Sequence, residues 1–428
     1  VPVYDVGANL GARDIRRSSQ LPILGREQEL QEIRSLLRAV GGRTGSAVTV
    51  TGPTGIGKSR LVDEILTGTE LPVLRIRGEP YGAASAYQLL RDPFRALLGV
   101  SPDQPGALGD QLLDRLERSA ADLLPMAPLL ADLLQIDVPA TPEVDAIDAQ
   151  FRPDWTARTV ISLLARLRPD PLVLVVEEAH WVDAASQQLL HRLVEATAEH
   201  PWLVIVVRRE ESGGFTPTTG DSVVLGPLPA DIMRELVIAA SEATPLRPHE
   251  VDSIVDRADG RPLFVTEVMR TAVAGGQVAA LPDSIGAVRD AQMDQLHPQT
   301  RRVLRYSAVL GRSFPRVLLR ETLESDGITV DAATIEDLGA FLEEDGPLRY
   351  RFRNSLVRDA AYEGLAFRTR ARLHKQAGEA LELLITTQGA DADADADAAT
   401  LSLHFLHAGD HTRTLEHARR AAHVARRS

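Results

Sequence analysis

The fold of this chain is decided by the stretch Gly52-Pro53-Thr54-Gly55-Ile56-Gly57-Lys58-Ser59. It satisfies the phosphate-loop pattern GxxxxGK followed by Ser or Thr at every specified position. A short run of β-formers, 47–51, precedes it, and helical periodicity predicts a helix over 58–66. Strand, glycine-rich loop and helix in this order are the context that the pattern requires. The sequence therefore predicts a site for the phosphates of a nucleoside triphosphate.

The residue types of the loop explain how it would bind phosphate. Its glycines let successive backbone N–H groups point inward as an anion-binding nest at a helix N-terminus. Lys58 is one of two lysines among 47 basic residues, and a compact ammonium can bridge β- and γ-phosphates where a planar guanidinium is too wide. Ser59 would give its hydroxyl to Mg²⁺. The residues expected to contact ATP or ADP here are Gly52, Thr54, Gly55, Ile56, Gly57, Lys58, Ser59 and Arg60.

Two carboxylates follow a second strand candidate. Five apolar residues, 172–176, end in Glu177 and Glu178. A phosphate loop needs such an acid at the end of a neighbouring strand. We expect Glu177 to hold the Mg²⁺ shell together with Ser59, although aspartate is the more usual residue there. We expect Glu178 to orient or deprotonate the attacking water.

Two arginines follow a third strand candidate, 203–207. Arg208 comes directly after it and would reach the γ-phosphate from within the same chain, while its neighbour Arg209 is the alternative. For either arginine, the pattern fits an ordinary surface position as well as it fits a contact to phosphate. The predicted catalytic set is therefore Lys58, Glu177, Glu178 and Arg208.

Strand and helix patterns alternate through the first half of the chain. The strand candidates are 47–51, 72–76, 172–176, 203–207 and 223–225, and the longer helical stretches between them are 84–98, 111–134 and 149–167. Alternation of this kind predicts an α/β fold with a parallel five-stranded sheet covered by helices. We place this phosphate-loop domain at 21–228, after a linker, 1–20, from a preceding domain.

The second half of the chain is mainly helical. Three helices, 231–240, 249–258 and 264–274, predict a helical domain over 229–280. The alternation of large and charged residues in 348–353 suits a two-stranded wing, so we expect a winged-helix domain over 281–380. An Ala-Asp repeat predicts an acidic linker over 381–400. Helices at 401–408 and 412–425 resemble a first tetratricopeptide-like hairpin over 401–428.

Composition narrows the functional classes. The net charge is −13, which does not match DNA or an anionic membrane, so we expect neither a membrane partner nor nucleic-acid binding through this segment. The chain has no cysteine, which excludes disulfides, thiolate zinc sites and cysteine nucleophiles. No apolar run approaches the ~20 residues that span a bilayer, and the start has no signal-peptide layout, so a cytoplasmic location is expected.

Five motifs in order resemble one family. The phosphate loop is accompanied by Ile23-Leu24-Gly25-Arg26-Glu27, by Glu177-Glu178-Ala179-His180-Trp181-Val182-Asp183, by Gly260-Arg261-Pro262-Leu263-Phe264, and by a segment from Phe352 to Tyr362. Together they resemble the signal-transduction ATPases with numerous domains (STAND), a branch of the AAA+ class. The resemblance covers roughly residues 21–380. It implies that Gly25 and Arg26 lie against adenine and ribose, that Arg208 is a sensor arginine, and that Pro262 packs near the base.

The same resemblance implies a switch rather than a metabolic ATPase. ADP would hold the closed state and exchange for ATP would open the chain and permit self-association, while the repeats would sense a ligand or protein. Position 354, where many relatives place a histidine against the β-phosphate, is Asn354, which can donate a hydrogen bond but cannot become a cation. The resemblance also implies an output domain outside this segment, either a DNA-binding transcription regulator or a nucleotide cyclase.

A different class of function remains open at this point. A DNA-binding AAA+ initiator or loader would grip duplex with its winged helix. Between residues 281 and 375 the sequence has 15 basic and 14 acidic residues, whereas DNA-gripping modules usually show a clear basic excess. The charge balance therefore favours the switch.

Overall fold

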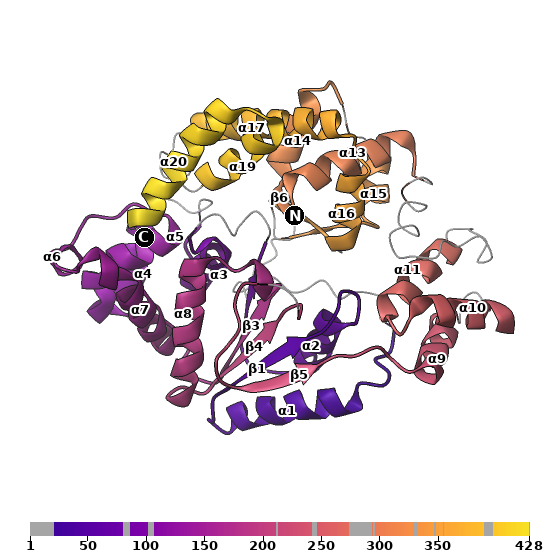
Figure 1. Ribbon diagram of the computed structural model, residues 1–428. Coiled ribbons are helices and arrows are strands. Elements are labelled where there is room, and N and C mark those ends of the chain that lie inside the picture. The colour runs from indigo at the N-terminus through magenta and orange to yellow at the C-terminus, as the bar shows by residue number, and fades with distance from the viewer. Residues whose placement is uncertain are drawn as a thin grey trace, which may run out of the picture.

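The computed structural model describes residues 21–79, 86–101, 107–210, 213–241, 246–273, 293, 296–328, 330, 332–345, 348–353, 355–388 and 397–427. They form three units, each with its own apolar core. We call them the sheet unit (residues 22–228), the three-helix unit (230–273) and the C-terminal unit (293–427). Figure 1 shows the C-terminal unit on the far side of the sheet unit from α1 (Glu27–Gly41).

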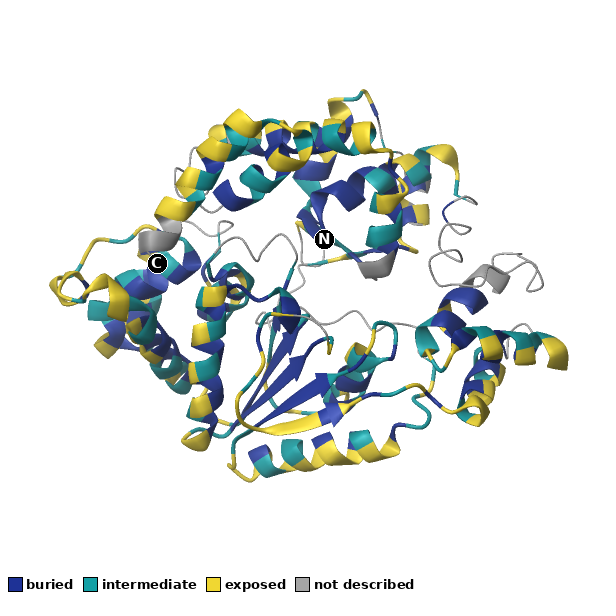
Figure 2. Cartoon of the chain, viewed as in Figure 1, coloured by how far each residue is buried: buried dark blue, intermediate teal, exposed yellow. Residues whose placement is uncertain are grey.

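A parallel sheet of five strands organises the sheet unit, as predicted. Its order is β2-β3-β4-β1-β5, and every pairing is parallel. Because the central strands are buried on both faces, they read as continuous apolar runs, and Figure 2 shows them as the most buried part of the unit. The strands are β1 (Ser46–Thr51), β2 (Val73–Arg77), β3 (Leu172–Glu177), β4 (Trp202–Val207) and β5 (Asp221–Val224).

Helices cover both faces of the sheet. Val173 and Val175 point to the face that α1 and α2 (Lys58–Leu66) cover, and Leu174 and Val176 point to the opposite face. This period of two is what a strand between two helical layers requires. The opposite layer contains α3 (Gln88–Leu98), α5 (Ala127–Leu134), α7 (Arg152–Leu167) and α8 (Ala184–Glu195).

The prediction of a single helix over 111–134 is wrong. The structure divides it into α4 (Leu108–Ser119), a 3-10 turn (Ala121–Met126) and α5. Ala120 leaves the helical region, with φ −160° and ψ 51°, and Pro125 cannot donate a helical hydrogen bond. Apolar periodicity continues through the break because all three pieces pack on the same core. A short helix, α6 (Pro142–Asp145), and a 3-10 turn (Ala149–Phe151) lead from there to α7.

The three-helix unit contains α9 (Ala230–Ala240), α10 (Pro248–Ala258) and α11 (Pro262–Val273). Its core includes Leu228, Met233 and Phe264, and Leu21 and Leu24 pack against it. The residues just before α1 therefore pack against the three-helix unit, so these two units are in contact.

The C-terminal unit combines helices with a three-stranded antiparallel sheet of order β6-β8-β7. The pairing of β7 with β8 supplies the hairpin predicted around 348–353. Its elements are α13 (Pro298–Leu310), β6 (Ser313–Pro315), α14 (Arg316–Glu324), α15 (Ala332–Leu338), β7 (Leu342–Glu344), β8 (Arg349–Phe352), α16 (Ser355–Glu363), α17 (Phe367–Gln388), α19 (Ala398–Ala408) and α20 (His411–Arg427).

The boundary predicted at 381–400 differs from the structure. Helix α17 continues to Gln388 and α19 begins at Ala398, so the predicted linker is helical at both ends. Leu381, Leu401 and Phe405 belong to the same apolar core as the three-stranded sheet. Residues 389–396, which carry the Ala-Asp repeat, lie outside the described residues. The helix pair 398–427 is thus packed into the C-terminal unit rather than set apart from it.

Candidate active site

The phosphate loop joins β1 to α2 and has the backbone that its glycines allow. Gly52 and Gly57 have φ values of 145° and 102°, which L-residues with a side chain rarely adopt. A Cβ on Gly52 would lie 2.6 Å from the carbonyl oxygen of Leu225, so this position also has no room for a side chain. Ile56 is buried and anchors the loop, while Ser59 is exposed in the first turn of α2. The loop thus presents an anion-binding nest at the N-terminus of α2.

Lys58 lies across this loop. Its Nζ donates to the carbonyl oxygens of Gly52, at 2.7 Å, and Pro53, at 2.9 Å. Burial lowers the pKa of Lys58 to about 8, and the nearby positive charge of Arg209 adds to the effect, while Glu178 opposes it. A phosphate in the loop would replace two neutral acceptors with a charged one. The ammonium thus lies at the phosphate loop, and its role toward phosphate stays a prediction.

The Gly260–Phe264 motif contacts the phosphate loop, and Gly25-Arg26 lies nearby against residues 226–232. The N–H of Leu263 donates to the carbonyl oxygen of Gly55 at 3.2 Å, which brings the Gly260–Phe264 motif against the phosphate loop. Arg26 donates to the carbonyl oxygen of Gly226 at 2.5 Å, and a Cβ on Gly25 would lie 2.9 Å from Ile232. Segments far apart in sequence, among them Gly25-Arg26, the phosphate loop, Pro227-Leu228 and Pro262-Leu263, therefore meet at the junction of the sheet unit and the three-helix unit.

Glu177 ends β3 and is almost fully buried. Its carboxylate accepts from Arg75, at 3.0 Å, and from Arg77 Nε, at 2.7 Å, both on the adjacent strand β2. Burial alone would raise the pKa of Glu177, but the two guanidinium groups outweigh it and lower the pKa to about 2. Arg75 also pairs with Asp63 of α2, so the carboxylate of Glu177 lies on the face of the sheet that α2 covers. The two arginines compete with a Mg²⁺ ion for its oxygens.

Glu178 lies at a strained corner directly after β3. Its φ of 52° is left-handed, and a Cβ on Gly78 would lie 2.5 Å from its carbonyl oxygen. One carboxylate oxygen is 3.2 Å from Nε2 of His180, and the other is 3.0 Å from Nη1 of Arg312 in the C-terminal unit. Burial raises the pKa of Glu178, but Arg312 and then His180 more than offset it, so the pKa is lowered. The predicted catalytic base is thus an ionised carboxylate in a cationic setting.

The two arginines after β4 have different surroundings. Arg208 is buried and donates to the carbonyl oxygens of Arg209 and Phe215, each at 3.1 Å, so its guanidinium holds the loop that follows. The charge of Arg209 affects the pKa of Lys58, Glu178 and His180, which places it beside the phosphate loop and the acids. Arg208 also contributes to the lowered pKa of His180, so both arginines lie near the acids, and Arg209 is the one whose charge acts on Lys58.

Some contacts around the site could not be found by the motifs. Asp183 accepts from the N–H of Ser186 at 2.9 Å and caps α8, so the last acid of the Glu177–Asp183 motif is structural here. Arg75 and Arg77 alternate in β2, which is a usable signal that both side chains share one face with Glu177. No local sequence pattern indicates that Arg312 reaches Glu178. Asn354 lies outside the described residues.

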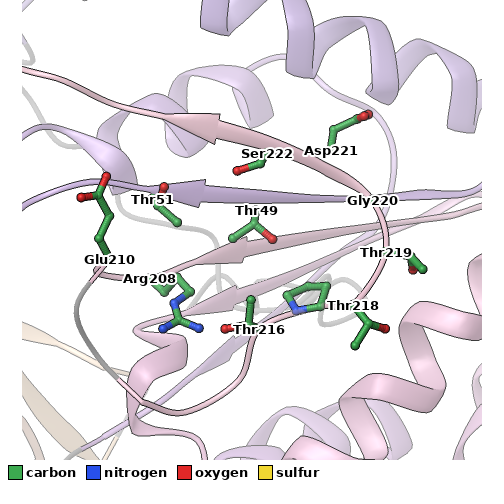
Figure 3. Close-up of a pocket in the computed structure, with 11 residues that line it drawn as sticks. Thr49, Thr51, Arg208, Glu210, Thr216, Thr218, Thr219, Gly220, Asp221 and Ser222 are labelled. Carbon is green, nitrogen blue, oxygen red and sulfur yellow. The ribbon is translucent and has the colours of Figure 1, made fainter.

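A groove of about 380 Å³ opens beside the site but is not part of it. It lies between the ends of β1 and β5 and the loop 213–220 (Figure 3). Hydroxyls of Thr49, Thr51 and Ser222 line it with Arg208 and Glu210, and its lining contains no residue of the phosphate loop from Gly52 to Ser59. We do not assign the nucleotide to it.

Among the described residues, no helix combines the length and apolarity that a bilayer crossing demands.

Comparison with known proteins gives similarity to an ATPase domain family. Residues 22–206 match the family model of the AAA ATPase domain. The chain is 26% identical over 391 residues to an uncharacterised protein of Rhizobium meliloti, a match that covers 83% of this chain and 36% of that protein.

Two solved structures are similar at lower identity. A STAND protein with a tetratricopeptide repeat sensor from Pyrococcus horikoshii aligns with a TM-score of 0.52 at 12% identity, covering 91% of this chain and 48% of that one. The Aeropyrum pernix ORC1 protein in complex with DNA aligns with a TM-score of 0.41 at 15% identity, covering 84% and 97%. The chain thus spans about half of the first structure and about a third of its curated relative. Residues 22–206 match an AAA ATPase domain, and the fold of the chain is similar to that of the Pyrococcus horikoshii STAND protein.

Proposed function

From the AAA ATPase domain at residues 22–206, we propose that the chain is a regulatory switch that binds ADP or ATP with Mg²⁺ and hydrolyses ATP slowly. The observation that carries the proposal is the hydrogen bond from the N–H of Leu263 to Gly55. It places the three-helix unit directly on the phosphate loop. A nucleotide bound there contacts both units, so a change in its phosphates changes the relative stability of their arrangements.

The residues of the site have separate roles in this proposal. The loop N–H groups and Lys58 bind the phosphates, and Ser59 with Glu177 holds Mg²⁺, which supplies charge neutralisation for phosphoryl transfer when bound. Glu178 orients and deprotonates the attacking water. Arg209 rather than Arg208 senses the γ-phosphate. Gly25, Arg26 and Pro262 lie at the base and ribose, and Asn354 remains a candidate contact to the β-phosphate.

The wider role follows the same logic and is also proposed. The ATP state opens the chain and self-associates, the helix pair 398–427 begins a repeat array that senses a ligand or protein, and the output is transcription regulation or nucleotide cyclisation by another part of a cytoplasmic protein. These assignments rest on the STAND-class fold and on the greater length of the relatives.

A DNA-binding initiator is the second candidate, and the charge pairing within the C-terminal unit argues against it. Arg351 pairs with Glu343 at 2.6 Å, Arg316 pairs with Glu344 at 2.6 Å, and Arg349 donates to Ser313. Arg351 and Arg316, paired with carboxylates of their own unit, contribute little to the counterion release that drives duplex binding. Duplex affinity in the micromolar range at 150 mM salt, falling steeply as salt rises, would favour this candidate over the switch.

The rate of hydrolysis tests the proposal. We expect the purified chain to carry ADP and to turn over Mg-ATP below about 0.1 per second, against a median near 10 per second for enzymes. Mass spectrometry of the released nucleotide and a phosphate-release assay measure the two quantities. Fast steady-state turnover, or no nucleotide binding at all, would remove the switch as an explanation.

Nucleotide affinity should depend on pH through Lys58. Because burial lowers the pKa of Lys58 to about 8, the free protein loses the ammonium as the pH rises through that value. A bound phosphate raises the pKa again, so binding above pH 8 takes up a proton. We expect ADP to bind about tenfold more weakly at pH 9 than at pH 7. Calorimetry in buffers of different ionisation enthalpy checks the uptake, and equal affinity without uptake at pH 9 would contradict it.

A further inference from the structure

The C-terminal unit reaches the predicted catalytic acid with one side chain, Arg312. This residue lies between α13 and β6, and its carbonyl oxygen accepts the N–H of Phe352 at 2.8 Å. The backbone of Arg312 is therefore fixed to the three-stranded sheet of its own unit. Its Nη1 lies 3.0 Å from Oε1 of Glu178, with the two side chains 14% and 21% exposed. The contact is a largely buried ion pair between two units with separate cores.

This ion pair engages the carboxylate that would activate water. Burial lowers the pKa of His180 to about 4, so the imidazole on the other oxygen of Glu178 is neutral at pH 7 and Arg312 brings the full charge into contact. The guanidinium of Arg312 takes Oε1 of Glu178, so this oxygen does not accept from a water while the ion pair is in place. Glu178 in this arrangement is a poor general base.

The arginines on Glu177 and Glu178 differ in where they come from. Arg75 and Arg77 belong to β2 and move with Glu177, because both strands are in one sheet. Arg312 belongs to another unit, so its contact breaks when the units separate. Further charged groups of both units lie around Arg312. The sheet unit contributes Arg77 and Glu79, and the C-terminal unit contributes Asp345 and Arg349. A polar boundary of this kind can open without exposing either core.

We infer that Arg312 holds Glu178 in a state that cannot activate water, so that the C-terminal unit restrains ATP hydrolysis by direct ion pairing. The inference rests on the proposed function and deepens it, because it names how hydrolysis is regulated at that site. The restraint acts on the catalytic acid and needs no contact between the C-terminal unit and the nucleotide. Asn354, whatever its role, is therefore not the sole means of holding the closed state.

The Arg312→Gln variant tests the inference in the full chain. It removes the charge but keeps a side chain of similar reach, and we expect turnover of saturating Mg-ATP to rise about tenfold, within the 5- to 150-fold range typical of coupling between sites. Arg316→Gln is the matched control, because Arg316 lies in the same unit and pairs with Glu344 of that unit. It should leave turnover unchanged. Arg312→Lys keeps the charge and should restore most of the restraint.

A second measurement separates this inference from the proposed function. Since the chain has no cysteine, Gln188→Cys in α8 and Glu324→Cys in α14 accept a pair of fluorophores without further changes. We expect Arg312→Gln to lengthen the distance between them in nucleotide-free protein, whether or not the chain hydrolyses ATP. An unchanged distance in Arg312→Gln would overturn the inference. So would ATP turnover that stays level or falls in this variant while ADP still binds. Loss of nucleotide binding in the parent chain would instead refute the proposed function.

Discussion

Replacing Lys58 with alanine is expected to weaken the binding of both ADP and ATP about a hundredfold. The ammonium is half-buried beside the loop and would make charge-assisted hydrogen bonds to phosphate, each of about 1.5–3 kcal/mol. Removing it also leaves the nest of backbone N–H groups as the main source of affinity. Isothermal titration with each nucleotide measures the loss.

The chain provides a matched control for this substitution. Lys375 is the other lysine of the sequence, lies exposed on α17, and is 3.9 Å from Glu379. Lys375→Ala removes the same charge and should leave nucleotide affinity unchanged. If Lys58→Ala binds ADP as tightly as Lys375→Ala does, the nucleotide does not lie in the phosphate loop.

The second large effect is expected at Glu178. Glu178→Gln keeps the size of the side chain but removes its ability to take a proton, so we expect turnover to fall by at least about a hundredfold with ATP still bound. Single-turnover hydrolysis and ATP titration separate the two quantities. Glu195→Gln, an exposed acid on α8 paired with Arg192, is the control and should be unaffected.

Glu178→Gln carries a second consequence that Lys58→Ala lacks. Because Arg312 then faces a neutral amide, the ion pair between the units is lost together with the catalytic base. The variant should therefore hydrolyse slowly and yet show a longer distance between the units. A variant that hydrolyses at the normal rate would exclude Glu178 as the base.

Local patterns predicted the framework of the molecule. The strand–loop–helix around Lys58 and the apolar run before Glu177 depend on neighbours in sequence, so the five-stranded parallel sheet and the position of the acids could be predicted. The break at Ala120 could not, because apolar residues continue through it and only the backbone changes direction. The extent of α17 into the predicted linker was missed because its apolar face covers a core made by distant residues.

Partners of the site residues were harder to predict than the residues themselves. The choice between Arg208 and Arg209 depends on carbonyl groups of the loop that follows, which no pattern encodes. The pairing of Arg312 with Glu178 joins residues 134 positions apart and depends on the arrangement of two units.

The distance between labels at positions 188 and 324 tests nucleotide control of the chain most directly. It is measured in the otherwise unchanged chain with Mg-ADP and with a slowly hydrolysed ATP analogue. If nucleotide state decides whether the C-terminal unit holds Glu178, the distance is short with ADP and longer with the analogue. The same distance with both nucleotides, each bound at saturation, would contradict a switch.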